Sequence, residues 1–345
     1  MTIVETRSII GGVDTHLDVH VAAALDHNGG VLGVESFPAT PVGFAELHTW
    51  LVGFGPVERV GVEGGTGAYG AGLARFLRTA GVVVIEVDRP NRQARRRHGK
   101  SDAIDAVEAA RAALSGRARA VAKTADGNVE AMRVLMVAFR SGRETRTRCL
   151  NQLRHLGFCG PDDLRERFRD VRVEALAQNA AGLRPNAGRD AVMFATTLAM
   201  RTLARRVLDI DADCARLHDE LAQLVKATAP TLLALPGVGV HTAALLLIAA
   251  GDNAERITSE AAFAHFCGVA PIHASSGKTI RHRLNRGGDR QANHALWRIV
   301  FTRMGSDQRT RVYVDRRLAE GRSKPEIMRI LKRYVAREIY RHLPR

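Results

Sequence analysis

Short apolar runs separated by turn residues dominate the first third of the chain. Runs of this length, bounded by glycine, asparagine and aspartate, are typical of β-strands. They predict five strands, over residues 9–13, 17–25, 31–36, 59–62 and 82–87. The turn residues at 26–30 would join the second and third strands as a hairpin. Helical spacing predicts helices over about 71–80 and from about Asp102 onward.

The order of these elements, three strands followed by strand, helix, strand and helix, indicates the fold class. Consecutive strands without an intervening helix form an antiparallel meander, whereas strands separated by a helix can pair in parallel. We therefore expect a mixed α/β sheet in residues 1–125, in the element order of a ribonuclease H-like (resolvase-like) domain.

Helical spacing replaces the strand signals after this region. It covers residues 128–156 and 189–228 and is interrupted at Pro161 and at residues 185–188. Long helices of this kind bury their apolar faces by folding back on each other or by pairing with a second subunit. Residues 126–228 are therefore predicted to form a helical or coiled-coil linker region.

The last region, residues 229–345, is predicted to be mainly helical. Residues 232–243 read as a helix, a tight turn at Gly237 and Gly239, and a second helix, a pattern that resembles a helix-hairpin-helix. Glycines let the backbone approach a phosphate closely, and the N-terminus of the second helix offers free N–H groups. We therefore expect both glycines to contact a nucleic-acid backbone.

The charge balance points to a polyanionic partner. The chain of 345 residues has 51 lysines and arginines against 36 acids, a net charge of +15 and a pI near 10.6. Nucleic acid is the partner that such an excess favours, although a GC-rich genome also raises the arginine count. Residues 301–345 hold 13 basic residues against five acidic ones but no broad aromatic face, which disfavours a membrane surface.

A second basic cluster directly precedes the predicted helix at Asp102. Its members are Arg89, Arg92, Arg95, Arg96, Arg97 and Lys100. A charge run is usually a solvated surface. Here its place next to candidate metal ligands favours contacts with the phosphates of a scissile strand.

The cysteines and the apolar stretches exclude other classes. Cys149, Cys159, Cys214 and Cys267 show no paired spacing, so neither a structural zinc site nor a disulfide framework is expected. The first residues lack an apolar signal core, and no apolar stretch is long enough to span a bilayer. We expect a soluble, cytoplasmic protein without a membrane partner.

Four acids in the first third form the candidate catalytic and metal-binding set. Asp14 and Glu63 each follow a predicted strand, and Asp102 and Asp105 share one face at the start of a predicted helix. Gathered carboxylates repel one another unless a cation compensates, so they predict one or two Mg²⁺ ions for phosphodiester chemistry. The structural alternative stays open, because acids are favoured in the first turn of any helix.

Residues beside these acids receive supporting roles. Ser101 is expected to cap the predicted helix, which places both of its acids near the first turn. His16 and Asp18 are assigned to the second strand as structural residues, with at most an indirect contact to the metal site.

A loop rich in hydroxyl, glycine and basic residues lies near the end of the chain. Ser275 or Ser276, followed by Gly277, could attack phosphorus if cations neutralise the phosphate. From residue types alone an ordinary phosphate-binding loop is the preferred interpretation, and His273 is expected to be solvated. The basic residues predicted to contact nucleic acid here are Lys278, Arg281, Arg283, Arg286 and Arg290. ATP binding is not expected, because a Walker motif needs a glycine that is absent.

Taken together, these motifs resemble the transposases of the insertion sequence 110 group. The matching segments are residues 12–14, 61–63, 100–106, 235–239, 266–271, 275–278 and 286–290. The resemblance covers most of the chain. It implies a resolvase-like domain whose DEDD tetrad, here Asp14, Glu63, Asp102 and Asp105, binds Mg²⁺.

The same resemblance implies a serine nucleophile that links covalently to DNA. The family motif has serine directly before glycine, which selects Ser276, with Ser275 as the fallback. It further implies strand exchange between DNA sites, guidance by a structured RNA from the element's own flank, and a homodimer or tetramer. Two other interpretations of the residues stay open. One is a metal-dependent, junction-resolvase-like nuclease without a covalent intermediate, and the other is a non-catalytic nucleic-acid-binding protein.

Overall fold

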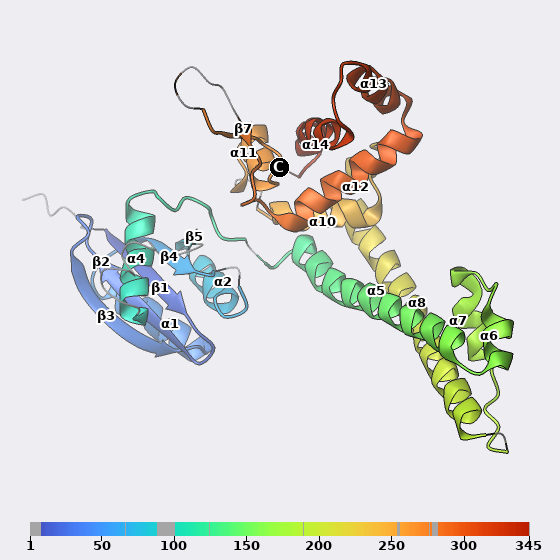
Figure 1. Cartoon of the computed structure of the whole chain (residues 1–345). Coiled ribbons are helices and arrows are strands. Elements are labelled where there is room, and N and C mark those ends of the chain that lie inside the picture. The colour runs from blue at the N-terminus through green and yellow to red at the C-terminus, as the bar shows by residue number, and fades with distance from the viewer. Residues whose placement is uncertain are drawn as a thin grey trace, which may run out of the picture. The chain divides into compact units, whose positions relative to one another are not determined.

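The computed structural model describes residues 8–65, 67–87, 101–123, 125–188, 190–253, 256–275, 277 and 282–344. They form two compact units (Figure 1). The first unit contains the residues up to Gly127 together with residues 250–263, and the second contains residues 128–249 and 264–344. The chain therefore returns to the first unit for one short segment before it completes the second.

The first unit is built on a five-stranded sheet in the order β3-β2-β1-β4-β5. The strands are β1 (Ile9–Thr15), β2 (Val19–Leu25), β3 (Val31–Pro38), β4 (Val57–Glu63) and β5 (Val83–Val87). The first three strands form an antiparallel meander, and β4 and β5 continue the sheet in parallel on the other side of β1 (Figure 1). The predicted mixed sheet is confirmed, but the second strand begins two residues later than expected.

A helix that the sequence analysis did not predict, α1 (Pro41–Val52), connects β3 to β4. The Thr40 hydroxyl caps it by accepting a hydrogen bond from the Gly43 amide at 3.2 Å, and a proline occupies its first turn. Apolar residues surround the whole helix, with Leu47 buried but Val42 exposed. The sequence therefore shows no clear amphipathic period, which is why the helix was missed.

The two faces of the sheet are covered by different helices. One face packs against buried leucines of α1 and of α2 (Ala71–Thr79). The residues of β1 and β4 on that face are Ile9, Val13, Val60 and Val62. The opposite face is covered by α4 (Asp102–Leu114), which rests against Gly12 and Gly61. Because side chains alternate along a strand, Asp14 and Glu63 belong to the face that α4 covers.

The two glycines let α4 lie directly on the strands. A Cβ atom at Gly12 would stand 2.2 Å from the backbone oxygen of Ala106, and one at Gly61 would stand 2.4 Å from that of Ala109. No side chain fits at such distances, because protein interiors are close-packed. This contact fixes how closely the start of α4 approaches the ends of β1 and β4.

We expect Gly12→Val to destabilise the protein by about 3 kcal/mol, because the new side chain would overlap the backbone of α4 and push the helix off the sheet. Gly305→Ala, near the end of α12 (Arg290–Ser306), is the control, since a Cβ there meets nothing within 4 Å and alanine favours a helix. Urea unfolding followed by circular dichroism measures both variants. A Gly12→Val protein as stable as the wild type would contradict the close contact.

Two long antiparallel helices, α5 (Asn128–Cys159) and α8 (Ala191–Thr228), dominate the second unit (Figure 1). Arg146 of α5 and Asp211 of α8 form a bidentate ion pair, in which Arg146 Nη2 donates a hydrogen bond to Asp211 Oδ2 at 3.0 Å. The predicted fold-back of long helices is confirmed. Pairing of these helices with a second subunit stays a prediction.

The connection between the long helices contains two short ones. The predicted break at Pro161 is confirmed, since α6 (Asp162–Phe168) begins directly after it and α7 (Val173–Ala181) follows. These helices share a core with α5 and α8. Large buried members of that core include Leu150, Leu153, Phe168, Leu176, Met193 and Met200.

The remaining elements are mainly helical, as predicted. They are α9 (Pro230–Leu233), α10 (Val240–Ala250), α11 (Glu260–Phe266), β6 (Ile272–His273), β7 (His282–Arg283), α12, α13 (Gln308–Ala319) and α14 (Lys324–Tyr340). The antiparallel pair of β6 and β7 stands where only a loop was expected, because two-residue strands are too short to show a period. Among the described residues, no helix is both long and apolar enough to cross a membrane.

Candidate metal centre

Two of the candidate carboxylates lie at the ends of neighbouring parallel strands. Val13 of β1 pairs with Val62 of β4, so the next residues, Asp14 and Glu63, stand at the same level of the sheet. The side chain of Thr15 ties the strand ends together by donating a hydrogen bond to the Glu63 carbonyl at 2.9 Å. Asp14 and Glu63 lie side by side because β1 and β4 run parallel, so their carboxyl ends meet at the same edge of the sheet.

The other two carboxylates begin α4. The Ser101 hydroxyl accepts a hydrogen bond from the Ile104 amide at 3.3 Å, which confirms the predicted cap. Asp102 and Asp105 both fall in the first turn. Their exposure differs: the Asp102 side chain is 49% exposed, whereas Asp105 is only 1% exposed. Asp102 is therefore the acid of this pair that solvent or a substrate can reach.

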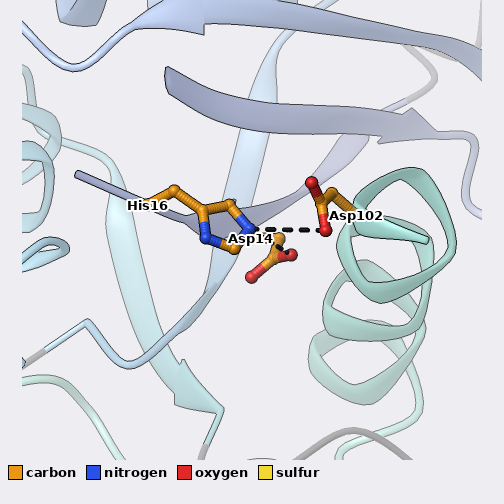
Figure 2. Close-up of side chains that lie close together, drawn as sticks. All are labelled: Asp14, His16 and Asp102. Carbon is orange, nitrogen blue, oxygen red and sulfur yellow. Dashed lines mark hydrogen bonds and ion pairs between the residues drawn. The ribbon is translucent and has the colours of Figure 1, made fainter. Parts of the chain in front are cut away.

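A histidine joins two of these acids (Figure 2). His16 Nε2 lies 3.1 Å from Asp14 Oδ2 and 3.4 Å from Asp102 Oδ1. One potential ligand atom from each of the three residues lies within 4.8 Å of the others. Among the described residues, Glu63 and Asp105 fall outside that group of three. Their role as ligands stays a prediction, although both lie on the same side of the sheet.

The assignment of His16 and Asp18 to the second strand was wrong. Both belong to the loop between β1 and β2, which starts only at Val19. The chain leaves β1 after Thr15 and enters β2 at Val19, and in this loop the His16 side chain contacts Asp14. The nearest sequence signal is the two-residue spacing of His16 from Asp14, but strand alternation ends at Thr15 and does not by itself place His16.

The electrostatics of the cluster are unfavourable for bare carboxylates. Burial raises the pKa of Asp14 above its ordinary value, His16 opposes that shift, and the charges of Asp105 and Asp102 add to it. Burial, together with the nearby His16, also lowers the pKa of His20. A cation among the carboxylates would reverse the balance at Asp14, because opposite charge favours the ionised form.

An open cavity borders the cluster. It has a volume of about 390 Å³, and its lining includes His16, Asp102 and the exposed side chains of Leu17 and Tyr69. The two cluster residues are thus reachable from solvent through a space large enough for part of a polymeric substrate.

The serine loop is described only in part. Ser275 is exposed, and the flanking strands pair Ile272 with Arg283 and His273 with His282. The histidine at 273 is exposed, as expected. Several predicted nucleic-acid contacts and the preferred nucleophile lie outside the described residues, namely Arg89, Arg92, Arg95, Arg96, Arg97, Lys100, Ser276, Lys278 and Arg281. The three other basic residues predicted to contact nucleic acid, Arg283, Arg286 and Arg290, are exposed.

Packing against α12 explains the first glycine of the turn between α9 and α10. Gly237 has φ +72°, and a Cβ there would lie 3.1 Å from the Ile299 carbonyl oxygen. Arg303 holds the turn against α12 by donating to the Pro236 carbonyl at 2.7 Å. Gly239 is exposed, but its amide already donates to the Thr242 hydroxyl at 3.0 Å. Phosphate contacts at these glycines stay a prediction.

Comparisons with known proteins add to this geometry. Residues 11–156 match a transposase family model of the DEDD type from the IS110 group, and residues 229–315 match the model of the transposase IS116/IS110/IS902 family. A Streptomyces coelicolor protein described as "Insertion element IS110 uncharacterized 43.6 kDa protein" is 33% identical over 139 residues. That match covers 39% of this chain and 34% of the relative, so the chain spans about a third of the relative's length.

The two family models cover different parts of the chain, and the first extends to residue 156, inside the helical middle. The first covers the mixed sheet and all four candidate carboxylates, and the second covers the serine loop. Both carry the name of the same group of mobile elements. The chain therefore belongs to the IS116/IS110/IS902 family of transposases.

Proposed function

We propose that this protein is a DNA transposase that cuts and exchanges strands at the ends of an insertion sequence, with divalent cations held where β1, β4 and α4 meet. The observation that carries the proposal is the convergence of Asp14, His16 and Asp102 within 4.8 Å, in the segment matched by a DEDD transposase model. Mg²⁺ is the proposed ion, one or two per site, because carboxylate oxygens are its preferred ligands.

The residues present suit such an ion. Asp14 is a buried carboxyl flanked by two further acids, an arrangement that costs free energy until a cation neutralises it. Asp102 offers an exposed oxygen, and Glu63 and Asp105 would complete the tetrad from the same face. When bound, a divalent ion would neutralise the scissile phosphate and favour attack at phosphorus. The chain's own task is to hold these carboxylates at one point through the strand register and the close packing of α4.

We propose Ser276 as the nucleophile, with Ser275 as the alternative. Its hydroxyl oxygen would bond to phosphorus as the scissile P–O bond breaks, and the departing oxygen would take up the proton. The family membership supports this assignment, as do the glycine that follows and the exposed arginines at 283, 286 and 290, which can neutralise a phosphate. Without those cations, a neutral serine would be a poor nucleophile toward a polyanion.

The proposed partners are DNA, a structured guide RNA and further copies of the chain, in a dimer or tetramer. The net charge of +15 supports binding to a polyanion. We also propose that α9, its turn and α10 bind DNA as a helix-hairpin-helix. Sequencing of nucleic acids that co-purify with the protein is expected to return one structured RNA encoded beside the element. Recovery of only random host RNA would contradict the guide.

The function predicts a strict cation requirement. DNA carrying the element's ends, incubated with the full chain and the co-purified RNA, should be cut and joined to protein in Mg²⁺ or Mn²⁺, and neither event should occur in EDTA. Denaturing gels of end-labelled DNA measure both cleavage and adduct. Cleavage without an adduct would instead indicate a metal-dependent nuclease, and binding without cleavage a non-catalytic protein.

A further inference from the structure

The side chain that joins the two acids at the proposed metal centre is a histidine, outside the DEDD tetrad. We infer that His16 is itself a ligand of the cation, so that the centre has a mixed nitrogen and oxygen donor set and binds Mn²⁺ more tightly than Mg²⁺. The inference rests on the proposed metal centre and adds a residue and an ion preference to it.

The spacing of the three side chains carries the first step. Ligands about 2.1 Å from one cation lie about 3.0 Å apart at right angles and about 3.4 Å apart at tetrahedral angles. His16 Nε2 stands 3.1 Å from Asp14 Oδ2 and 3.4 Å from Asp102 Oδ1. Both distances fall in that range, so the spacing of His16 from each of the two acids suits ligands of one shared ion (Figure 2).

The loop that carries His16 is held in place by its neighbours. The His16 amide donates to Nδ1 of His20 at 3.4 Å, and the fully buried His20 ring stacks on Phe44 at 5.6 Å between ring centres. His20 is in turn fixed in β2. The backbone of His16 is therefore tied to β2, which limits where its ring can lie beside the two acids, and a metal ligand needs such support.

The ring also has access to the ion's entry path. The His16 side chain is 45% exposed and lines the cavity that Asp102 also borders. A cation can thus reach the imidazole and the carboxylate from the same side, while Asp14 provides the buried end of the site.

The donor chemistry gives the ion preference. Mg²⁺ binds oxygen almost exclusively and gives up its waters reluctantly, whereas imidazole is a good ligand for transition metals. Replacing one carboxylate or water by a neutral nitrogen weakens the site for Mg²⁺ relative to Mn²⁺. The opposing structural interpretation is that His16 only bridges the two acids by hydrogen bonds and leaves when the cation binds.

Pulsed EPR of Mn²⁺ bound to the full chain separates these interpretations, because the electron spin echo is modulated by a coordinated ¹⁴N nucleus. We expect ¹⁴N modulation in the wild type and its loss in His16→Ala and His16→Gln. His27→Ala, a histidine exposed in the β2–β3 turn, is the matched control and should keep the signal. Circular dichroism confirms that each variant folds. Modulation that persists without His16, or that is absent from a wild type that binds Mn²⁺, would overturn the inference.

Calorimetric titration gives a second readout. His16→Ala should weaken Mn²⁺ binding by about 10-fold or more and Mg²⁺ binding by less than about threefold. Equal losses for the two ions would overturn the inference but leave the metal centre in place. Failure of the wild type to bind either ion, or binding that Asp14→Asn does not change, would instead overturn the proposed metal centre.

Discussion

Asp14→Asn is expected to abolish cation-dependent strand cleavage and, at the same time, to make the metal-free protein more stable at neutral pH. The loss of cleavage should reach about 10³-fold or more, because a buried ligand supports several kcal/mol of charge stabilisation in the transition state. The gain in stability has a separate cause in the environment of the carboxyl, which is buried and flanked by two acids.

The sign of the stability effect follows from the raised pKa of Asp14. A carboxyl whose pKa is higher in the folded than in the unfolded state favours folding while it is protonated. That contribution is complete below the ordinary Asp pKa of 3.8 and is lost as the pH rises through the raised value. At pH 7 the ionised Asp14 therefore opposes folding, and a neutral asparagine removes the penalty.

Thermal unfolding in EDTA measures this effect. Asp14→Asn should raise the Tm at pH 7 by about 2–4 °C, the change that about 1 kcal/mol produces in a domain of this size. The gain should vanish toward pH 3. Added Mn²⁺ should stabilise the wild type but not the variant.

Asp26→Asn is the matched control. The Gly30 and Asn28 amides donate to the Asp26 carboxylate and lower its pKa. The ionised Asp26 carboxylate therefore stabilises the fold above the ordinary Asp pKa, and this stabilisation is lost as the pH falls. Asp26→Asn should accordingly lower the Tm at pH 7. A decrease in Tm for both variants in EDTA would contradict the electrostatic account of Asp14.

Ser276→Ala is expected to eliminate the covalent protein–DNA adduct while DNA binding persists. Removing the attacking oxygen leaves no bond to phosphorus to form, and loss of a nucleophile typically costs about 10⁴-fold or more. The hydroxyl contributes little to affinity beside the surrounding basic residues. Labelled DNA resolved on denaturing gels measures the adduct, and a mobility shift measures binding.

Ser275→Ala is the control at the neighbouring position. If it keeps the adduct and Ser276→Ala loses it, the assignment is correct. The opposite pattern would move the nucleophile by one residue. An adduct in both variants would exclude a serine of this loop, and loss of DNA binding in either would show that the loop serves chiefly to hold phosphate.

Much of the first unit could be read from the sequence because its strands are short, apolar and separated by turn residues. The order β1, β2, β3, β4 and β5 and the start of α4 after Ser101 all follow from local patterns. Helix α1 was not predicted, because its apolar residues face all sides. The remaining sequence signal for this helix was its N-terminus, where Thr40 caps the helix and Pro41 follows. Local signals fail where a helix shows no buried stripe.

The candidate site was predicted in its acids but not in its geometry. The sequence placed Asp14 and Glu63 at strand ends and Asp102 at a helix start. It assigned His16 to a strand, because alternation of apolar and polar residues does not reveal where a chain reverses. The contact of His16 with Asp14 and Asp102 needed the loop conformation.

By itself, the sequence determined the order of the five strands of the first unit, the basic charge and the kinds of side chain available for phosphodiester chemistry. The tertiary structure alone decided which of them meet. Asp102 reaches His16 and Asp14 because Gly12 and Gly61 admit α4 onto the sheet and because β1 and β4 pair in parallel register. Periodicity reports on neighbours along the chain, whereas strand register and helix packing depend on contacts between distant segments, which no local pattern encodes.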